Sequence, residues 1–160
     1  MRALQPTDLI QAAKDLAEAG KGKPRQAHLR RAVSTAYYAI FHCLAQACAD
    51  MMIGGSGADR SQPAWRQVYR ALEHGAAKSA CQNSRVVKKF PKDIDDFASV
   101  FVELQGKRHL ADYDPNVRYY KSSVKADISA AEDAIKQFTA VARKDRRAFA
   151  AHVLFRQRTS

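Results

Sequence analysis

The sequence predicts an all-α protein, folded as an up-and-down bundle of about five helices around a long antiparallel pair. Apolar residues recur at steps of three and four in several long segments, and no segment alternates with the period of two that is typical of strands. The chain has 160 residues, of which 46% are hydrophobic and 27% charged. These values are those of one globular domain, so we expect residues 1–160 to form a single unit with a basic tail from about residue 156.

Two helices are expected before the first flexible connection. The segment Pro6–Asp8 begins the first, with Thr7 as its cap, and the apolar face of this helix stops before Gly20. A longer helix follows, with apolar residues at helical spacing over Leu29–Ala47. The Gly-rich segment 53–57 then acts as a linker, because it lacks the Gly-Lys-Ser/Thr ending of a phosphate-binding P-loop.

The middle of the chain contains one shorter helix and a basic loop. Pro63 begins this third helix, and His74 and Gly75 end or bend it. A short further turn is expected over residues 76–81. A polar and basic loop over residues 82–89 then leads to the next long helix.

The second half of the chain is expected to form two long helices. The fourth runs from Pro91 to about Tyr113, because the next residue, Asp114, precedes a proline and is biased out of the helical region. The fifth carries apolar residues over Val124–Val141, and its pattern can be extended through Val153.

The charge of the chain points to polyanionic partners. Lys and Arg total 27 against 16 Asp and Glu, a net charge of +11. Such a surplus favours RNA, DNA or nucleotides as ligands. The alternative is a basic surface that serves only solubility.

The cysteines and the hydrophobic segments indicate where the protein resides. Cys43, Cys48 and Cys81 form no CxxC pair, so we expect buried, inert thiols in a reducing cytosol. No apolar run approaches the ~18 residues of a membrane span, and the N-terminus lacks the apolar stretch of a signal peptide. These features predict a cytoplasmic protein without a membrane span.

A polar and aromatic stripe runs along the second expected helix. Arg31, Thr35, Tyr38 and His42 are spaced by four, three and four residues, so they share one side of the helix. Arg31, Tyr38 and His42 are candidates for binding a nucleotide or RNA. The alternative is that Tyr38 and His42 are ordinary boundary residues with satisfied hydrogen bonds.

A second group of candidates lies at the end of the fourth expected helix. Arg108 and Asp112 are four residues apart, and so are His109 and Tyr113, which places a cation, an imidazole, a carboxylate and a phenol near one helix end. These four are the candidate catalytic residues. The alternative is a surface ion pair worth less than ~1 kcal/mol beside a simple helix stop.

These two groups resemble the signatures of a known family. The segment Leu29–His42 is similar to the N-terminal signature of HEPN domains (higher eukaryotes and prokaryotes nucleotide-binding). The segment Arg108–Pro115, Arg-His-Leu-Ala-Asp-Tyr-Asp-Pro, is similar to the second signature of one HEPN subgroup. The resemblance extends over roughly residues 9–149, because the helical pattern between the motifs also fits.

The resemblance implies a helical bundle that commonly dimerises with its Arg-containing motifs facing each other across a cleft. Many family members are metal-independent endoribonucleases. Others bind nucleotides, or pair with a small nucleotidyltransferase as toxin and antitoxin or in a defence setting. The implied partners are therefore a second copy of the chain, RNA or a nucleotide, and a nucleotidyltransferase.

The sequence departs from the nuclease pattern at one point. Nuclease members carry a His separated from the motif Arg by four to six residues, whereas Arg108 is followed at those distances by the residues of Tyr113–Pro115. Arg108 can stabilise charge on a phosphate, but the proton-transfer group must come from elsewhere. His109 of a second copy or His42 are candidates. His74 is a further candidate, although a His before a helix-ending Gly is also explained by the dipole of a helix C-terminus.

A basic run near the C-terminus is a further candidate for RNA binding. Arg143, Lys144, Arg146 and Arg147 lie close together in the sequence, and each phosphate contact would add to a salt-sensitive affinity. The alternative is a solvated helix end, where cations suit the dipole of a C-terminus.

No motif indicates a metal or cofactor. HExxH, CxxC and GxSxG are absent from the sequence. The interpretation that best fits the sequence is a non-catalytic or weakly catalytic HEPN-like domain that binds a nucleotide, RNA or a partner protein. One alternative is a metal-independent endoribonuclease that acts as a homodimer, and the other is a structural dimerisation module.

Overall fold

The computed structural model describes residues 4–20, 22–23 and 25–158, and within these ranges it contains eight α-helices and no strand. The all-α fold class is confirmed. The helices are α1 Pro6–Ala17, α2 Gln26–Met52, α3 Gln62–Ala71, α4 His74–Gln82, α5 Ser84–Val87, α6 Lys92–Tyr113, α7 Lys121–Thr139 and α8 Arg143–Leu154.

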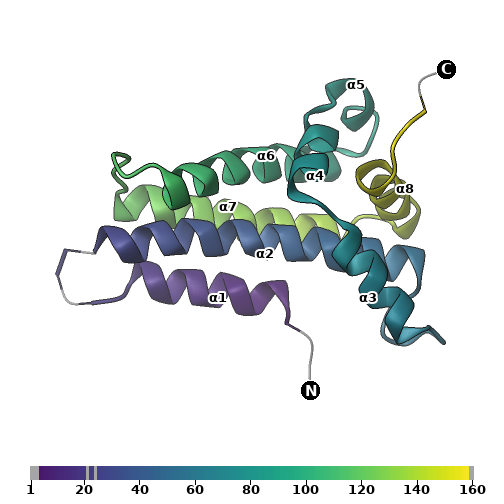
Figure 1. The fold of residues 1–160 in the computed structure, drawn as a ribbon, viewed down its shortest axis with the longest axis horizontal. Coiled ribbons are helices and arrows are strands. Elements are labelled where there is room, and N and C mark those ends of the chain that lie inside the picture. The colour runs from purple at the N-terminus through teal and green to yellow at the C-terminus, as the bar shows by residue number, and fades with distance from the viewer. Residues whose placement is uncertain (1–3, 21, 24, 159–160) are drawn as a thin grey trace.

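Four of these helices form the body of a bundle. Helices α1, α2, α6 and α7 lie side by side, and each runs antiparallel to the one before it in this order (Figure 1). Helices α3, α4 and α5 connect the end of α2 to the start of α6, and α8 crosses that same end of the bundle. The long antiparallel pair is therefore α2 and α6, joined through three shorter helices. None of the helices in the described ranges is both long and apolar enough to cross a lipid bilayer.

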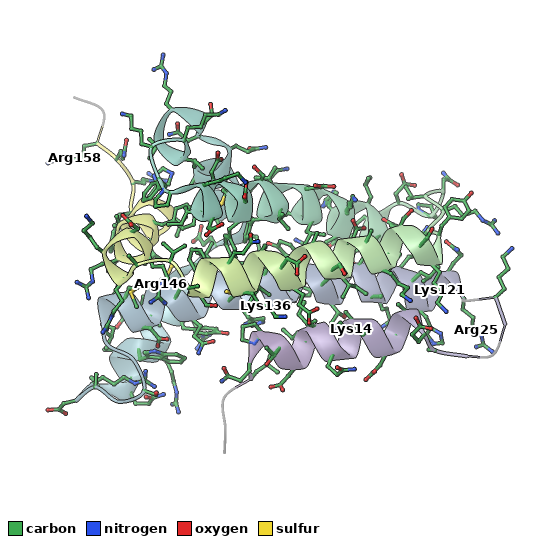
Figure 2. All side chains as sticks on the ribbon, turned by 180° about the vertical axis from the view of Figure 1, so that it is seen from behind. Lys14, Arg25, Lys121, Lys136, Arg146 and Arg158 are labelled. Atoms are coloured by element: carbon green, nitrogen blue, oxygen red, sulfur yellow. The ribbon has the colours of Figure 1, made fainter. Side chains whose placement is uncertain are left out.

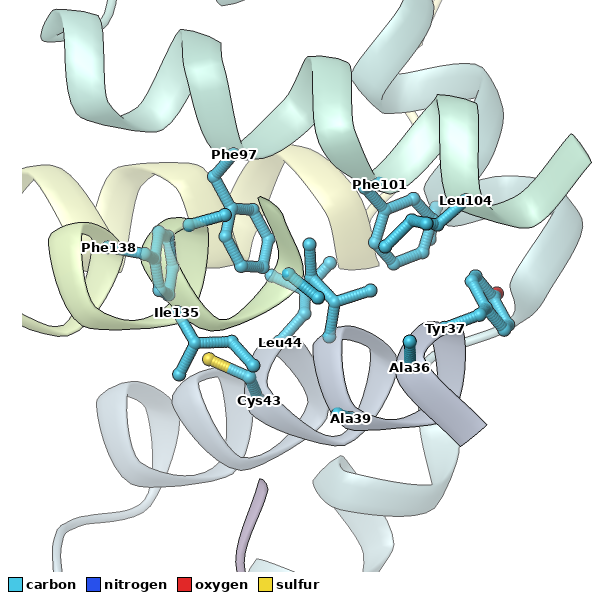
Figure 3. Close-up of a cluster of buried hydrophobic side chains, with 14 of the residues drawn as sticks. Ala36, Tyr37, Ala39, Cys43, Leu44, Phe97, Phe101, Leu104, Ile135 and Phe138 are labelled. Carbon is cyan, nitrogen blue, oxygen red and sulfur yellow. The ribbon is translucent and has the colours of Figure 1, made fainter. Parts of the chain in front are cut away.

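The core lies between α2, α6 and α7 (Figure 3). Phe97 of α6 stacks on Phe138 of α7, with 4.3 Å between ring centroids and 26° between ring planes. Ala36 of α2 is small and fully buried in the same cluster, which leaves room for the aromatic rings. Truncating a buried Phe in such a core typically costs about 3–5 kcal/mol, so these rings contribute strongly to stability.

All three cysteines are buried and free, as the sequence predicts. Burial raises the pKa of Cys43, Cys48 and Cys81 to about 12. Because the thiolate is the reactive form, these thiols are inert packing groups near neutral pH.

The first helix begins two residues earlier than a cap at Thr7 would allow. Thr7 does not cap it: Pro6 is already helical, and the Asp8 carboxylate accepts a hydrogen bond of 3.0 Å from the backbone N–H of Gln5. Proline suits the first helical position because it has no N–H to satisfy and its φ is preset. The helix ends at Ala17, before the positive-φ Gly20.

The connection between α2 and α6 is more helical than the sequence predicts. Helix α3 ends at Ala71 and not at His74–Gly75, because Leu72 turns into an extended conformation and buries its side chain in the core. His74 is instead the first residue of α4. The basic loop expected over residues 82–89 contains the single turn α5, whose Val87 is buried.

The fifth expected helix does not extend through Val153. Helix α7 ends at Thr139, whose hydroxyl donates to the carbonyl of Ile135 over 3.0 Å, and a separate helix α8 begins at Arg143. Phe149 and Val153 of α8 are buried in the same core as the apolar face of α7. The apolar pattern therefore continues across a change of direction that periodicity alone does not reveal.

The first turns of α2 hold the loop that follows α6. Arg30 donates to the carbonyls of Ala111 at 3.0 Å and Asp114 at 2.7 Å, and also to two carbonyls further along the loop. Its guanidinium lies over the ring of Tyr119, 5.6 Å from the centroid. One side chain thus satisfies the Ala111 carbonyl in the last turn of α6 and the carbonyl of Asp114 at its C-cap, which would otherwise need other partners.

We predict that Arg30→Ala lowers the free energy of unfolding by about 2–3 kcal/mol, because several carbonyls lose a charged donor at once. Urea denaturation measures this loss. The matched control is Arg31→Ala, which removes the same side chain from the next, exposed position and should change stability by less than about 0.5 kcal/mol. Equal losses in the two variants would contradict the assigned role of Arg30.

Candidate functional site

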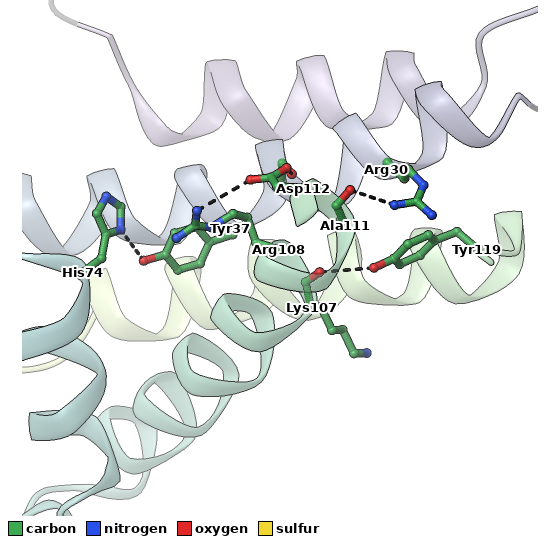
Figure 4. A network of polar contacts seen from close by, with 9 residues as sticks. Arg30, Tyr37, His74, Lys107, Arg108, Ala111, Asp112 and Tyr119 are labelled. Atoms are coloured by element: carbon green, nitrogen blue, oxygen red, sulfur yellow. Dashed lines mark hydrogen bonds and ion pairs between the residues drawn. The ribbon is translucent and has the colours of Figure 1, made fainter. Parts of the chain in front are cut away.

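The candidates on α2 and α6 meet at Arg108, where α4 also joins them (Figure 4). The guanidinium carbon of Arg108 lies 5.1 Å from the ring centroid of Tyr37 and 5.8 Å from that of Tyr38. The Arg108 side chain is only 14% exposed. Two aromatic rings of α2 therefore hold the guanidinium in place. Their attraction offsets part of the free-energy cost of removing this charge from water.

Asp112 links Arg108 to α2 a second time. Its Oδ2 lies 3.6 Å from Nη1 of Arg108, and its Oδ1 accepts a hydrogen bond of 2.6 Å from the Ser34 hydroxyl. The Asp112 side chain is one third exposed, so this pair keeps contact with solvent. The i,i+4 pair expected from the sequence is thus anchored between helices and is more than a pair on a single helix surface.

His74 completes the group from the start of α4. Its Nδ1 lies 2.6 Å from the hydroxyl of Tyr37, and its ring stacks on Phe41 with centroids 3.9 Å apart. Gln105 of α6 donates to the His74 carbonyl over 3.1 Å. The explanation of His74 by the dipole of a helix C-terminus is wrong, because the residue begins a helix. We call Arg108, Asp112, Ser34, Tyr37, Tyr38 and His74 the Arg108 cluster.

The environment keeps His74 and Tyr37 uncharged. The pKa of His74 is lowered first by burial, then by the positive charge of Arg108 and by His42. Burial is also the main reason that the pKa of Tyr37 lies well above its usual value. A neutral imidazole has one ring nitrogen that can accept a proton. In this cluster the neutral imidazole of His74 lies near the guanidinium of Arg108.

The stripe expected on α2 divides between two places. Tyr38 belongs to the Arg108 cluster, with its ring edge-on to His74 at 6.1 Å. His42 instead hydrogen-bonds through Nδ1 to the hydroxyl of Tyr69 on α3, and burial lowers its pKa. Arg31 is exposed, and its carbonyl accepts a hydrogen bond from the Thr35 hydroxyl.

The other two candidates on α6 lie outside the cluster. His109 and Tyr113 are exposed, and their rings contact each other at 5.0 Å. Adjacent residues on a helix point about 100° apart, so His109 faces away from the direction of Arg108. Within one chain, the imidazole next to Arg108 is that of His74 and not that of His109 or His42.

Sequence reasoning assigned no functional role to Ser34 or Tyr37. Ser34 precedes Tyr38 by four residues, so the same helical spacing that relates Arg31 to Thr35 could have pointed to it. No spacing in the sequence indicates the position of His74, because that position depends on Leu72 ending helix α3.

The basic run expected near a helix end is at the start of α8. Arg143, Lys144 and Arg147 are exposed, whereas Arg146 is half-buried and donates from Nε to the Val141 carbonyl over 2.9 Å. The explanation by the dipole of a helix C-terminus is therefore wrong. Cations are unfavourable in the first turn of a helix, so the exposed Arg143 and Lys144 do not stabilise α8 through its dipole.

A second basic segment approaches this helix. Arg85, Lys88 and Lys89 are exposed on and just after α5, and Phe90 packs against Phe149 of α8 with centroids 5.5 Å apart. Among the residues that the structure describes, none of the exposed cations of these two segments forms an ion pair. We call them the basic end: Arg85, Lys88, Lys89, Arg143, Lys144 and Arg147.

Several cations of the face formed by α1 and α7 are neutralised by ion pairs. Figure 2 shows Lys14 and Lys121 on the face formed by α1 and α7. Lys14 pairs with Glu132 at 3.0 Å, and Lys121 pairs with Glu18 at 2.7 Å. The exposed cations of the basic end, which form no ion pair with a described residue, are therefore available to a ligand.

Nothing in the described part of the chain resembles a metal centre: no three His, Cys, Asp or Glu side chains come together there. The Arg108 cluster contains a cation, a neutral imidazole, a phenol, a hydroxyl and one carboxylate. Such a set can bind a phosphate and move a proton without a metal.

Comparisons of the chain with protein-family models found no match. Comparisons with curated proteins and with solved structures found none either.

We predict that Arg108→Gln raises the pKa of His74 toward its ordinary value, because the guanidinium disfavours a second positive charge nearby. NMR titration of the histidine ring protons measures this shift. The lowered pKa in the folded protein also means that the contribution of His74 to stability is complete above about pH 6.5 and declines as the pH falls toward the folded pKa. The control Arg31→Gln removes an exposed charge of α2, and an equal shift in that variant would contradict the role of Arg108.

Proposed function

We propose that the protein is a HEPN-like helical domain that binds single-stranded RNA through the basic end and the Arg108 cluster. One observation carries the proposal: exposed cations gather in the first turns of α8, where the helix dipole disfavours them, and no described acid pairs with them. A charge arrangement that does not stabilise the fold is explained by a polyanionic ligand.

The Arg108 cluster supports the proposal with a second contact point. Tyr38 is 36% exposed and offers an aromatic face beside the guanidinium of Arg108. Aromatic rings that stack on bases, together with cations that bind phosphates, are the usual means of holding single strands. The cluster adds recognition of a nucleotide to the non-specific attraction of the basic end.

Helix α4 connects these two surfaces. It begins at His74 in the cluster and ends at Gln82, directly before the basic segment of α5. Nine helical residues extend about 13 Å. A single strand lying along α4 would contact both surfaces, which favours RNA over a single nucleotide as the ligand.

The motif resemblance also supports a homodimer. Leu110 and Tyr113 are 44% and 69% exposed near the end of α6. Exposed apolar side chains of this kind are typical of surfaces that another chain covers. On the same resemblance we propose a second copy that covers Leu110 and Tyr113, and a paired nucleotidyltransferase in a toxin–antitoxin or defence setting. The three buried free thiols are compatible with the proposed cytoplasmic location.

We expect the variant Arg143→Ala/Lys144→Ala/Arg147→Ala to lose RNA affinity and to reduce the slope of log K against log salt by about 2, as three lost phosphate contacts imply. Fluorescence anisotropy with a labelled single-stranded RNA, at several salt concentrations, measures both. The matched control is Lys14→Ala/Lys121→Ala/Lys125→Ala, which removes the same charge from the α1 and α7 face.

Equal effects of the two triple variants would mean that RNA binding depends on the net charge of the protein and not on the basic end. Equal affinity for a mononucleotide and for RNA would make the protein a nucleotide-binding domain. If neither ligand binds and Arg108→Ala lowers only stability, the domain is a structural dimerisation module.

A second candidate function is metal-independent RNA cleavage, and the position of His74 favours it. If Nδ1–H donates to the Tyr37 oxygen, the other ring nitrogen can accept the proton of a 2′-hydroxyl. The 2′-oxygen would then attack the adjacent phosphorus, and the 5′-oxygen would leave and take a proton from water. Arg108 would stabilise the charge that develops on the phosphate.

For this candidate we expect cleavage of single-stranded RNA in the presence of EDTA, with rates lowered about 100-fold or more in His74→Gln and Arg108→Ala. Gel analysis of the products measures the rate and detects the 2′,3′-cyclic phosphate ends. His109→Gln, an exposed histidine outside the cluster, should cleave like the wild type. Intact RNA after incubation with the wild type would exclude catalysis and leave the binding proposal unaffected.

A further inference from the structure

A cavity of about 540 Å³ lies between the second half of α2, α3 and the N-terminal residues before α1. Its volume is within the range of about 300–1,000 Å³ that small-molecule sites occupy. We propose that this cavity binds a neutral, planar heterocycle with amide-like edges, the class to which nucleobases and nucleosides belong. Its main lining residues are His42, Gln46, Asp50, Gln62, Trp65 and Tyr69.

One wall of the cavity is a row of rings. The centroids of Trp65 and Tyr69 are 5.2 Å apart, and those of Tyr69 and His42 are 5.8 Å apart. Burial lowers the pKa of His42, so its ring is neutral at pH 7. Three uncharged rings in sequence favour a flat, aromatic ligand that packs against them.

The charges that line the cavity are already paired. Asp50 accepts a hydrogen bond of 2.8 Å from Nε1 of Trp65 and forms an ion pair with Arg60 at 3.4 Å. Arg60 also donates to the Gly54 carbonyl over 2.9 Å and lies over the Trp65 ring. No cation of the cavity is therefore free for a phosphate, and a charged ligand would disrupt this arrangement. A neutral ligand avoids that cost.

The polar edge of the cavity consists of amides. Gln46 projects from α2 and Gln62 from the start of α3, and no side-chain hydrogen bond joins either of them to another described residue. A carboxamide has an adjacent donor and acceptor, which matches the paired donor and acceptor on the edge of a nucleobase. The rings can therefore favour ligands of flat shape, and the two amides can favour those with a matching donor and acceptor on one edge.

This site is separate from the Arg108 cluster. The cavity opens between α2 and α3, whereas the cluster is built from α2, α4 and α6. His42 lines the cavity and does not hydrogen-bond to a member of the cluster. The inference thus stands independently of RNA binding at the basic end.

The chain has one tryptophan, so the Trp65 indole N–H gives a single NMR reporter from within the cavity. We would titrate the full-length protein with the four ribonucleosides and with their 5′-monophosphates. The expected result is a saturable shift of this resonance by at least one nucleoside, with a Kd below about 1 mM, and no tighter binding of its monophosphate.

Two variants and two controls make the test specific. Gln46→Ala and Gln62→Ala should each weaken binding about tenfold, as loss of one well-made hydrogen bond implies. Gln67→Ala removes an exposed amide of the same helix α3 from outside the cavity, and Gln137→Ala removes an exposed amide of α7, so both should bind like the wild type. The proposal is overturned if no nucleoside saturates the shift, if monophosphates bind more tightly, or if Gln67→Ala weakens binding as much as Gln62→Ala. None of these results bears on the RNA affinity measured with the triple variants.

Discussion

The structure depends on the burial of α2 on nearly all of its sides. Fourteen of its 27 residues are buried, and it packs against α1, α3, α6, α7 and α8. A helix enclosed in this way can keep polar side chains only along a narrow line, and those side chains need partners on the elements that cover it. In α2 this line is made of residues at steps of four, Ser34, Tyr38, His42, Gln46 and Asp50. Its first part joins the Arg108 cluster and its second part lines the cavity against α3, so both proposed sites follow from one constraint.

Helical periodicity is sufficient to predict the fold class and the two long helices that form the central pair. Periodicity fails to predict helix ends where one helix stops and the next begins within a continuous apolar pattern. Leu72 is buried in an extended conformation between α3 and α4, and Phe149 is buried after the turn that separates α7 from α8. At both places the residues on either side of the break are buried in the same core, so their spacing contains no sign of the change of direction. The sequence therefore predicts about five helices, whereas the described part of the chain contains eight.

The contacts of the candidate site that could be predicted are those between residues close together on one helix. The contacts that depend on distant parts of the chain could be predicted less well. Arg108 and Asp112 are related by one helical turn, and that pair is present. The approach of Tyr38 to Arg108 needed only the antiparallel packing of two long helices, which the sequence also predicts. His74 reaches the cluster because a buried leucine two residues earlier ends α3 and lets α4 begin, and no spacing rule contains that information. His42 follows the same helical stripe as Tyr38, yet Tyr69 of α3 provides its partner.

The electrostatics of the cluster are coupled to its packing. Arg108 is held against Tyr37 by the ring face, and the same tyrosine positions the His74 ring through its hydroxyl. The cation is thereby close enough to lower the pKa of the imidazole, while Asp112 balances part of its charge from the solvent side. Because Ser34 binds the other oxygen of Asp112, the carboxylate cannot move toward His74 without losing a hydrogen bond. The arrangement therefore keeps a neutral base and a positive charge side by side, a state that two freely mobile side chains would not maintain.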